Sequence, residues 1–431
     1  MTIGATHTTA SGMKEPIETS CSVHPKRSHL TGKLAAMVTF SGFPDDPRPR
    51  RAADALLAEG MILDLVCLGE LNTPAAEDQG SLRITRVRIR HTRGSALLYA
   101  YNYAAFIVVS SLILAWRTLW NRYDLVYVHN MPDVLVLCSL VPKLLGARVI
   151  LDQHDPMPEL LMTMTNAKKS AVPVRVIRRL ERWSIACVDR VITVNAAMKR
   201  LVGSRSCHPD KIDIVMNCPN DTIFPLHAVS RRRPSAYHDP FVLMYHGTLV
   251  ERNGLQVAVN AVERVRWKIP WIELRIYGKR TAYLDTSLRY VSANGLEEWV
   301  RYCGPRALEE LAAEINNCDV GVIPNICSPF TQINTPTRLF EYLALGKPVI
   351  APFTPGVLDY FKPGTLLFFA PGSAESLAAQ IESACVDYDH ALLTAVRGQR
   401  VYLAHTWPQE REKLVRSVDA LFQRDPSSHA A

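Results

Sequence analysis

The sequence predicts an α/β protein built from two doubly wound domains. Its 431 residues are enough for two domains with substantial cores. Short apolar strands alternate with helical segments on both sides of a polar, proline-containing segment, a pattern typical of helix-covered parallel sheets joined by a linker. The predicted ranges are a disordered tail at 1–31, a first domain at 32–225, the linker at 226–240, a second domain at 241–402, and a C-terminal helix and tail at 403–431.

Composition and charge limit the classes of protein that remain. A hydrophobic content of 48% and a charged content of 21% describe a globular chain and exclude a disordered one. The net charge of +8 is concentrated in residues 1–225, which hold 27 Lys and Arg against 20 Asp and Glu; the rest holds 22 against 21. This excess favours an anionic partner for the first domain, either a membrane surface or nucleic acid. We expect no nucleic acid, because the basic segments lack the interleaved aromatic residues of a stacking surface.

The ten cysteines show neither a CxxC pair nor the Cys/His spacing of a metal site. Cys67, Cys138 and Cys318 lie in apolar segments, which indicates reduced, buried thiols. Residues 1–31 are rich in Ser, Thr and His and lack the apolar core of a signal peptide. We therefore expect a cytoplasmic protein without a metal site.

The first predicted strand, at 34–40, runs into the charged loop GFPDDPRPRR. A helix ending at Ala58 and a strand at 63–68 follow, which is how a doubly wound domain begins. No GxGxxG motif follows the first strand, so the sequence contains no dinucleotide-binding fingerprint. A charged surface loop is one interpretation of this segment, which includes Asp46 and Arg48.

Residues 83–93 alternate basic with apolar side chains, which predicts a strand with one basic face. Residues 96–120 are strongly apolar and approach the length of a membrane span. Polar residues such as Asn102 interrupt them, so we do not interpret them as a span. Two interpretations remain: a buried helix, or a helix on an anionic membrane surface with Trp116 and Trp120 at the interface. The positive charge of the first half agrees with the membrane-surface interpretation.

Two predicted strands of the first half each lead to a histidine. Strand 124–129 ends at His129 and is followed by Asn130, and strand 149–153 is followed by His154 and Asp155. A single histidine is usually a structural residue. Ligands of open α/β sheets bind at the carboxyl ends of strands, however, so two histidines at the ends of neighbouring strands indicate a cleft.

Further elements complete both domains. A basic amphipathic helix at 174–188 is expected to have a solvated outer face. Strands are predicted at 191–194, 212–215, 242–245, 272–277, 299–303 and 319–323, and a terminal helix at 410–422.

Residues 334–349, NTPTRLFEYLALGKPV, predict a helix whose N-terminus suits a phosphate. Thr335 is placed as N-cap and Pro336 as the first helical residue, and Gly346 supplies the left-handed stop. The free N–H groups at such an N-terminus favour an anion. Glu341, about one and a half turns in, can reach a group beside that anion, such as a ribose hydroxyl. An ordinary capped helix with a surface glutamate is the alternative interpretation.

Cations follow two predicted strands of the second half. Gly247, after the strand at 242–245, lets the backbone approach a ligand closely. Arg252 lies in the same loop, and the planar fork of its guanidinium matches phosphate oxygens. Lys279 follows the strand at 272–277 and is a second candidate for phosphate. A solvated surface charge is the alternative for either cation alone.

Five motifs, in the same order, resemble those of one family. YDLVYVHNMPD, ILDQHDPMPEL, LERWSIACVDRVITVN, YHGTLVERNGL and NTPTRLFEYLALGKPVIAPFTPGVLDYF are each similar to segments of family-four glycosyltransferases. The resemblance implies the GT-B fold: two Rossmann-like domains facing across a cleft, with a C-terminal helix crossing back. It also implies retaining transfer of a sugar from a nucleoside-diphosphate sugar to a hydroxyl acceptor, without metal or cofactor. The branch it indicates builds bacterial cell-surface polysaccharides on lipid-linked saccharides, at the inner face of the cytoplasmic membrane.

The resemblance also assigns roles to particular residues. The departing diphosphate itself helps to take the acceptor proton, so no dedicated general base is expected. The residues placed at the catalytic centre are His129, Arg252, Lys279 and Glu341. The donor site adds Gly247, Thr248, Asn334, Thr335, Pro336 and Thr337. The acceptor site comprises Asp46, Arg48, Asn130, His154 and Asp155.

The chain departs from the family pattern at two points. The family often has two glutamates around the donor helix, and the first of them falls on Ile333 here. A basic pair is usual in the loop after Gly247, but Thr248 and Asn253 occupy those positions. Two other functions therefore stay open: a non-catalytic docking partner of a membrane glycosyltransferase, and a sugar-nucleotide epimerase.

Overall fold

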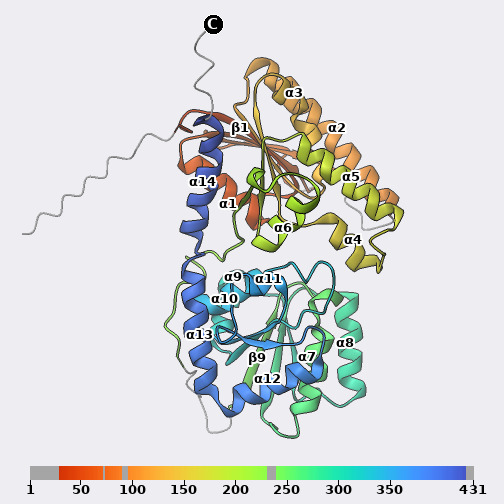
Figure 1. The fold of residues 1–431 in the computed structure, drawn as a ribbon, viewed down its shortest axis with the longest axis vertical. Coiled ribbons are helices and arrows are strands. Elements are labelled where there is room, and N and C mark those ends of the chain that lie inside the picture. The colour runs from red at the N-terminus through yellow and green to blue at the C-terminus, as the bar shows by residue number, and fades with distance from the viewer. Residues whose placement is uncertain (1–28, 71–72, 90–95, 231–238, 424–431) are drawn as a thin grey trace, which may run out of the picture.

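The computed structural model describes residues 29–70, 73–89, 96–230 and 239–423, which form two stacked α/β domains (Figure 1). The first domain contains a sheet in the order β3-β4-β2-β1-β5-β6-β7-β8, in which only the β3–β4 pair is antiparallel. The strand order reverses between β1 and β5, and such a switch point is where open α/β sheets bind ligands. The strands are β1 (Leu34–Gly42), β2 (Ile62–Leu68), β3 (Ala76–Asp78), β4 (Leu82–Val87), β5 (Leu125–His129), β6 (Arg148–Gln153), β7 (Arg190–Thr193) and β8 (Ile212–Ile214).

Helices cover both faces of this sheet, because its strands are apolar on both sides. In β1, Ala35 and Met37 pack toward one face, while Ala36 and Val38 pack toward the other. The first face is covered by α1 and α14, and the second by α2, the 3-10 helix η1, α5 and α6. The helices are α1 (Pro47–Ala58), α2 (Ala96–Trp120), η1 (Asp133–Ser139), α3 (Leu140–Leu144), α4 (Met157–Thr165), α5 (Val172–Ala186) and α6 (Ala196–Arg205).

The second domain has a parallel sheet in the order β11-β10-β9-β12-β13-β14. Its strands are β9 (Phe241–His246), β10 (Ile272–Tyr277), β11 (Val300–Gly304), β12 (Val320–Val322), β13 (Val349–Pro352) and β14 (Leu367–Phe369). Its helices are α7 (Leu255–Val265), α8 (Ala282–Ala293), α9 (Leu308–Asn316), α10 (Thr337–Ala344), α11 (Pro355–Leu358), α12 (Ala374–Val386) and α13 (Tyr388–Leu403). The predicted pair of doubly wound domains is therefore confirmed.

The C-terminal helix α14 (Trp407–Gln423) returns to the first domain, as predicted. Figure 1 shows α13 beside the second domain and α14 continuing upward along the first. Leu414 and Val418 are buried among side chains of α1 and the first sheet. The fully buried carboxylate of Glu410 accepts a hydrogen bond of 2.8 Å from the backbone N–H of Met216. This helix therefore ties the two domains together on one side.

Local details correct four expectations. Leu30, placed in a disordered tail, is fully buried; residues 1–28 of that predicted tail lie outside the described residues. The strand expected at 83–93 spans only Leu82–Val87, and its basic side chains pair with carboxylates: Arg86 with Glu77 and Arg83 with Asp64. Residues 90–93 lie outside the described part of the chain.

The other two concern helices. α2 forms over the predicted range, but only 28% of its most apolar 18-residue stretch is buried. The buried-helix interpretation is therefore wrong for its outer face. It is the one helix in the described residues long and apolar enough to cross a membrane. The N-cap position of α10 is Pro336, expected as the first helical residue, and not Thr335; no side-chain hydrogen bond caps this helix end. The Thr335 hydroxyl instead donates to the carbonyl of Gly356 at 2.8 Å and accepts from Nδ2 of Asn195 at 3.3 Å.

Candidate active site

Glu341 lies inside the second domain, at the end of β9. It projects from the second turn of α10, its side chain is 14% exposed, and one carboxylate oxygen is 3.4 Å from Nε2 of His246. Burial raises the pKa of Glu341 to about 7, with Arg338 and Arg51 opposing that shift. Burial lowers the pKa of His246 well below its usual value, and Arg338 adds to this. Glu341 therefore sits beside a neutral imidazole and can accept hydrogen bonds when it is ionised.

Arg338 lies one turn before Glu341, beside Gly247. Its Nη1 donates to the carbonyl of His246 at 2.6 Å, and its Nη2 donates to Oδ1 of Asn325 at 3.3 Å. Its guanidinium carbon is 5.1 Å from the centre of the Tyr245 ring. Gly247 has a φ of +122°, and a Cβ there would come within 3.2 Å of Cδ of Arg338. Glycine at this position thus allows the arginine to lie against the backbone.

The two predicted cations stand around the same strand ends. Arg252, in the loop after β9, has its guanidinium carbon 5.6 Å from the centre of the Phe330 ring. Lys279 is exposed directly after β10. Thr248 is exposed beside Gly247, and Asn253 donates from its amide to the carbonyl of Thr248 at 2.8 Å. The fold therefore brings the predicted donor residues of three segments to one edge of the second sheet.

The segment before α10 contacts the first domain. Asn195, which caps α6, donates from Nδ2 to the carbonyl of Ile333 at 2.8 Å and to the hydroxyl of Thr335 at 3.3 Å. Asn334, Pro336 and Thr337 lie in the same segment, so these four predicted donor residues share one backbone stretch held across the domain boundary.

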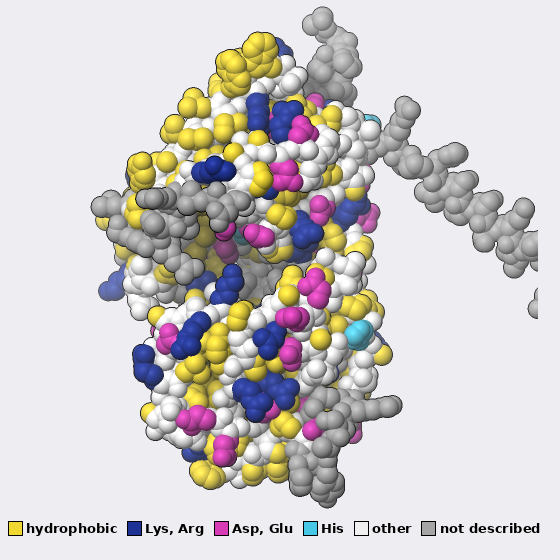
Figure 2. Space-filling model, turned by 180° about the vertical axis from the view of Figure 1, so that it is seen from behind, with side chains coloured by type: hydrophobic (Ala, Val, Ile, Leu, Met, Phe, Trp, Pro, Cys, Tyr) yellow, Lys and Arg dark blue, Asp and Glu magenta, His cyan; other side chains and the backbone are white. Residues whose placement is uncertain are grey.

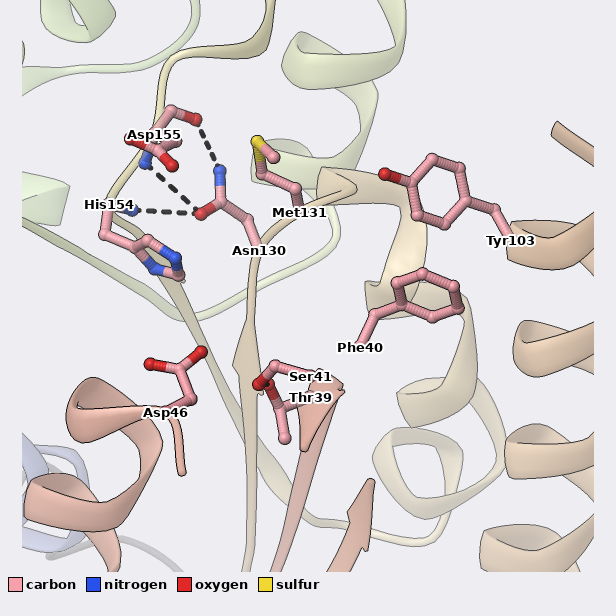
Figure 3. Close-up of a pocket in the computed structure, with 9 residues that line it drawn as sticks. All are labelled: Thr39, Phe40, Ser41, Asp46, Tyr103, Asn130, Met131, His154 and Asp155. Atoms are coloured by element: carbon pink, nitrogen blue, oxygen red, sulfur yellow. Dashed lines mark hydrogen bonds between the residues drawn. The ribbon is translucent and has the colours of Figure 1, made fainter. Parts of the chain in front are cut away.

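A cavity of about 340 Å³ opens at the carboxyl ends of β1, β5 and β6, at the switch point of the first sheet (Figure 3). Figure 3 shows the Asn130 side chain facing the histidine and the aspartate that follow β6. Its Nδ2 donates to the carbonyl of Asp155 at 2.6 Å, and its Oδ1 accepts from the N–H of His154 at 3.0 Å. The lining residues are Thr39, Phe40, Ser41, Asp46, Tyr103, Asn130, Met131, His154 and Asp155. Four of the five predicted acceptor residues therefore meet here.

Arg48, the fifth, corrects the prediction. It is buried and directed into the domain, where Nη2 lies 2.6 Å and Nε 2.9 Å from one oxygen of Asp152. Nη1 donates to the side chain of Asn217 at 2.8 Å. Burial alone would raise the pKa of Asp152, but Arg48 holds it below the usual value. Arg48 thus neutralises a buried carboxylate and does not line the cavity.

His129 is also buried, beneath His154, with 6.3 Å between the ring centres. Its Nδ1 is 3.4 Å from Asp152, and burial lowers its pKa to about 4. Ligand atoms of His129, Asp152 and His154 lie within 4.8 Å of one another, as in a metal site. Arg48 already bonds both oxygens of Asp152, however, and this fits a cation poorly. His129 is placed below the cavity wall, so a direct sugar contact stays a prediction.

A cavity of about 680 Å³ lies between the domains, bounded by α4, α5 and α6 on one side and by Pro329 and Ile333 on the other. Arg205 there holds Glu159 and Glu181 together, at 2.6 Å from each. The charged residues that line it are Lys169, Arg178, Arg182, Arg205 and Glu159, and the buried Glu181 beside them adds a second negative charge. This wall is therefore positively charged and faces the second domain.

Sequence reasoning missed Arg338, His246, Asn195 and Asp152. Arg338 stood inside the quoted motif, at i−3 from Glu341, so helical spacing could have placed both on one face. His246 directly follows a predicted strand, as His154 does, and the same rule applied to it. Nothing in the sequence indicates the pairing of Asp152 with Arg48, which lies 104 residues away.

Two family models match the chain. The model described as "Glycosyl transferase 4-like domain" matches residues 47–218, and the one described as "Glycosyl transferases group 1" matches residues 240–387. Together they cover most of both domains. The chain belongs to this family of GT-B glycosyl transferases, as the five motifs predicted.

Individual relatives agree. The chain is 23% identical over 242 residues to a probable glycosyltransferase, WbjE, of Pseudomonas aeruginosa, over 54% of this chain and 58% of that protein. It is 25% identical over 147 residues to the amylovoran biosynthesis glycosyltransferase AmsK of Erwinia amylovora, over 32% of this chain and 35% of that protein. The chain spans about half the length of the curated relatives it matches, or less.

Solved structures share the fold. Sucrose-phosphate synthase of Thermosynechococcus elongatus superposes with a TM-score of 0.75 at 18% identity, covering 91% of this chain and all of that one. Anabaena HepE in complex with UDP gives a TM-score of 0.63 at 14% identity, covering 90% of this chain and all of that one. At these identities the likeness concerns the fold alone.

Proposed function

We propose that the protein transfers a sugar from a nucleoside-diphosphate sugar to a hydroxyl group of an acceptor, with retention at the anomeric carbon and without a metal. The placement of α10 carries this proposal. Its N-terminus lies beside Gly247, near Arg252 and the end of β10, and Glu341 points inward from its second turn. An α-helix N-terminus flanked by cations stabilises a diphosphate leaving group, and a buried carboxylate can orient ribose hydroxyls.

A uridine nucleotide is the first candidate for the donor. The neighbouring structures include Anabaena HepE with UDP-glucose and an Escherichia coli trehalose-6-phosphate protein with UDP-2-fluoro glucose. The acceptor is proposed to enter the cavity at the switch point of the first sheet, where Asp46, Asn130, His154 and Asp155 present polar groups. A lipid-linked saccharide carries phosphate, and the basic cavity between the domains suits such a group.

The outer apolar face of the first domain supports work at a membrane surface. Figure 2 shows hydrophobic side chains gathered over the top and upper left edge of this domain. α2 packs beside η1 and α3, and α5 packs beside η1, so their outer surfaces adjoin. We define the outer apolar face by the exposed residues Tyr101, Val108, Leu112, Trp116, Leu119 and Trp120 of α2, Leu140 and Leu144 of α3, and Val172, Val176, Leu180 and Trp183 of α5.

Cations border this face. Arg122 follows α2, and Arg175 and Arg179 are exposed on α5. Aromatic and aliphatic side chains beside exposed arginines are the features of a helix that lies in the headgroup region of an anionic bilayer. We therefore propose peripheral attachment to the inner face of the cytoplasmic membrane, where a lipid-linked acceptor is within reach.

The deciding experiment is a thermal-shift panel of UDP, GDP, ADP and their common sugar conjugates, run in EDTA on the wild type and on Glu341→Ala. We expect one nucleotide to stabilise the wild type and not the variant, because a ligand that binds only the folded state raises its melting temperature. Glu309→Ala, which removes an exposed carboxylate of the same domain, is the matched control and should respond like the wild type.

The selected donor is then incubated with a prenyl-diphosphate-linked saccharide or with a simple glycoside, and the anomeric configuration of the product is read by NMR. Transfer with retention in EDTA supports the proposal. An inverted product or an absolute need for a divalent ion would contradict those parts of it. No shift with any nucleotide would instead favour a docking partner, and epimerised sugar nucleotide without acceptor would favour an epimerase.

A further inference from the structure

We propose that Arg338 binds the diphosphate of the donor and supplies the positive charge that Thr248 and Asn253 lack. This inference rests on the proposed function, because it assumes that a nucleoside diphosphate occupies the edge of the second sheet. It assigns a role to a residue that the sequence analysis left without one.

The position of Arg338 is the first observation. It lies in the first turn of α10, and its side chain lies against Gly247, so the guanidinium stands where the loop after β9 meets the helix N-terminus. Thr248, one of the two positions expected to carry a basic side chain, is the residue that follows Gly247. The positive charge that Thr248 does not supply in the loop after β9 is therefore supplied beside that loop by Arg338 of α10.

The hydrogen bonds of Arg338 are the second observation. A guanidinium has five N–H donors. Two bond the carbonyl of His246 and the side chain of Asn325, and the Tyr245 hydroxyl engages at most one more. Among the described residues no carboxylate comes within ion-pair distance of Arg338; Glu341 acts on it only at longer range. At least two donors and the full charge are therefore available to phosphate oxygens.

The contacts that Arg338 does make fix its direction. The hydrogen bonds to His246 and Asn325 and the stacking on Tyr245 hold the guanidinium of Arg338 at three points, so it has little freedom to move. A cation held in place before the ligand arrives loses less entropy on binding, and bidentate guanidinium–phosphate pairs are among the strong hydrogen bonds. Arg252, which stacks on Phe330 in the loop after β9, is the second cation of the same site.

A purely structural role is the competing explanation, since the same bonds join β9, α10 and the segment around Asn325. The two roles differ in one respect. If Arg338 only stabilises the fold, its loss should weaken the binding of all ligands alike. If Arg338 binds the diphosphate, its loss should weaken binding more for ligands that carry more phosphate groups. The test therefore compares UDP, UMP and uridine by calorimetric titration of the full-length chain, or the same series of whichever base the panel selects.

For Arg338→Gln we expect UDP affinity to fall about ten- to a hundredfold, the range for a lost charged hydrogen-bond pair, while uridine affinity stays unchanged. Arg338→Lys should retain part of the UDP affinity, because it keeps the charge and loses the fork. Arg280→Gln is the matched control. Arg280 is exposed near the end of β10 and already paired with Asp285 at 2.7 Å, so UDP binding should stay at the wild-type level.

Relocating the charge makes the test decisive even where Arg338→Gln lowers the melting temperature. Thr248→Arg, added to Arg338→Gln, returns a cation to the other side of Gly247 and should recover part of the preference for UDP over uridine. An unchanged preference in Arg338→Gln, or a loss that neither Arg338→Lys nor the double variant recovers, would overturn the inference. Failure of the wild type to bind any nucleotide would instead overturn the proposed function itself.

Discussion

Glu341 and His246 face each other across 3.4 Å without forming an ion pair. Burial raises the pKa of the carboxyl group to about 7 and lowers that of the imidazole well below its usual value, so at neutral pH the histidine is neutral and the carboxyl group is half protonated. Perturbed groups of this kind gather at functional sites. The pair makes the donor site sensitive to pH near neutrality, and two predictions depend on it.

Donor binding should strengthen as the pH rises through about 7. An ionised Glu341 accepts hydrogen bonds from two ribose hydroxyls, so binding favours loss of its proton. Calorimetric titration of UDP-glucose between pH 6 and 8, in buffers of different ionisation enthalpy, should show proton release that is largest below pH 7 and vanishes above it. UDP-glucose is used in this titration in place of UDP, because the terminal phosphate of UDP itself titrates at about 6 and would add its own proton signal. Glu341→Gln should bind more weakly with no pH dependence; equal proton release in this variant would exclude Glu341 as the source.

The free energy of unfolding should depend on the same group with the opposite trend. The folded-state pKa of about 7 lies above the ordinary value of 4.5, so the stabilisation from a neutral Glu341 is complete below pH 4.5. It is lost as the pH rises through about 7. Glu341→Gln carries no charge at any pH, and its melting temperature relative to the wild type should rise between pH 5 and 8. Glu309→Gln serves as the exposed control. If the difference in melting temperature between Glu341→Gln and the wild type stayed constant from pH 5 to 8, the pKa of Glu341 would not be raised in the folded protein.

Arg252→Ala should abolish most turnover and leave the fold intact. Removing one preorganised donor to a developing negative charge typically lowers the rate about 10²- to 10³-fold. The side chain stacks on Phe330, and no carboxylate of the described residues pairs with it, so its loss leaves no charge unpaired. Initial rates and the melting temperature are measured together, with the adjacent exposed Glu251→Ala as control. Wild-type activity in Arg252→Ala would remove this residue from the diphosphate site.

Arg48→Met should destabilise the first domain strongly. Its guanidinium neutralises the buried Asp152, and loss of one partner of a buried ion pair typically costs about 3–5 kcal/mol. Urea unfolding measures this. Arg50→Met is the matched control on the same helix, because its pair with Asp54 is exposed at 4.0 Å and such pairs contribute less than about 1 kcal/mol. A fully stable Arg48→Met with a raised KM for the acceptor would restore the acceptor role predicted from the sequence.

Replacing Trp116 and Trp120 by Ser should weaken binding to anionic vesicles. These side chains are 64% and 72% exposed, and losing the burial of one large apolar side chain corresponds to about ten- to a hundredfold in affinity. Co-sedimentation with vesicles of phosphatidylglycerol and phosphatidylcholine, against phosphatidylcholine alone, provides the measurement. Trp267→Ser, 75% exposed on the second domain, should bind like the wild type. Loss of binding in Trp267→Ser as well, or no binding by the wild type, would contradict the proposed attachment.

Much of the fold could be predicted because strands and helices leave local patterns. The apolar runs that became β5, β6 and β10 were found within a residue or two, and Gly346 does end α10, with a φ of +71°. The candidate site was predicted in outline for the same reason: the carboxyl ends of parallel strands share one edge. His129 also lies at the end of a strand, but its side chain is buried below the cavity wall. The position of a residue along a strand predicts at which edge of the sheet it lies, but not whether its side chain reaches the cavity.

The sequence by itself determined the two doubly wound domains, the returning helix and the segments that form the site, since periodicity, turn residues and motifs are properties of neighbouring positions. The tertiary structure decided where the polar side chains point. Arg48 binds Asp152 from 104 residues away, and Arg338 lies against Gly247 across 91 positions. The exposure of α2 was decided in the same way, because an apolar helix is buried or exposed according to what the rest of the chain packs against it.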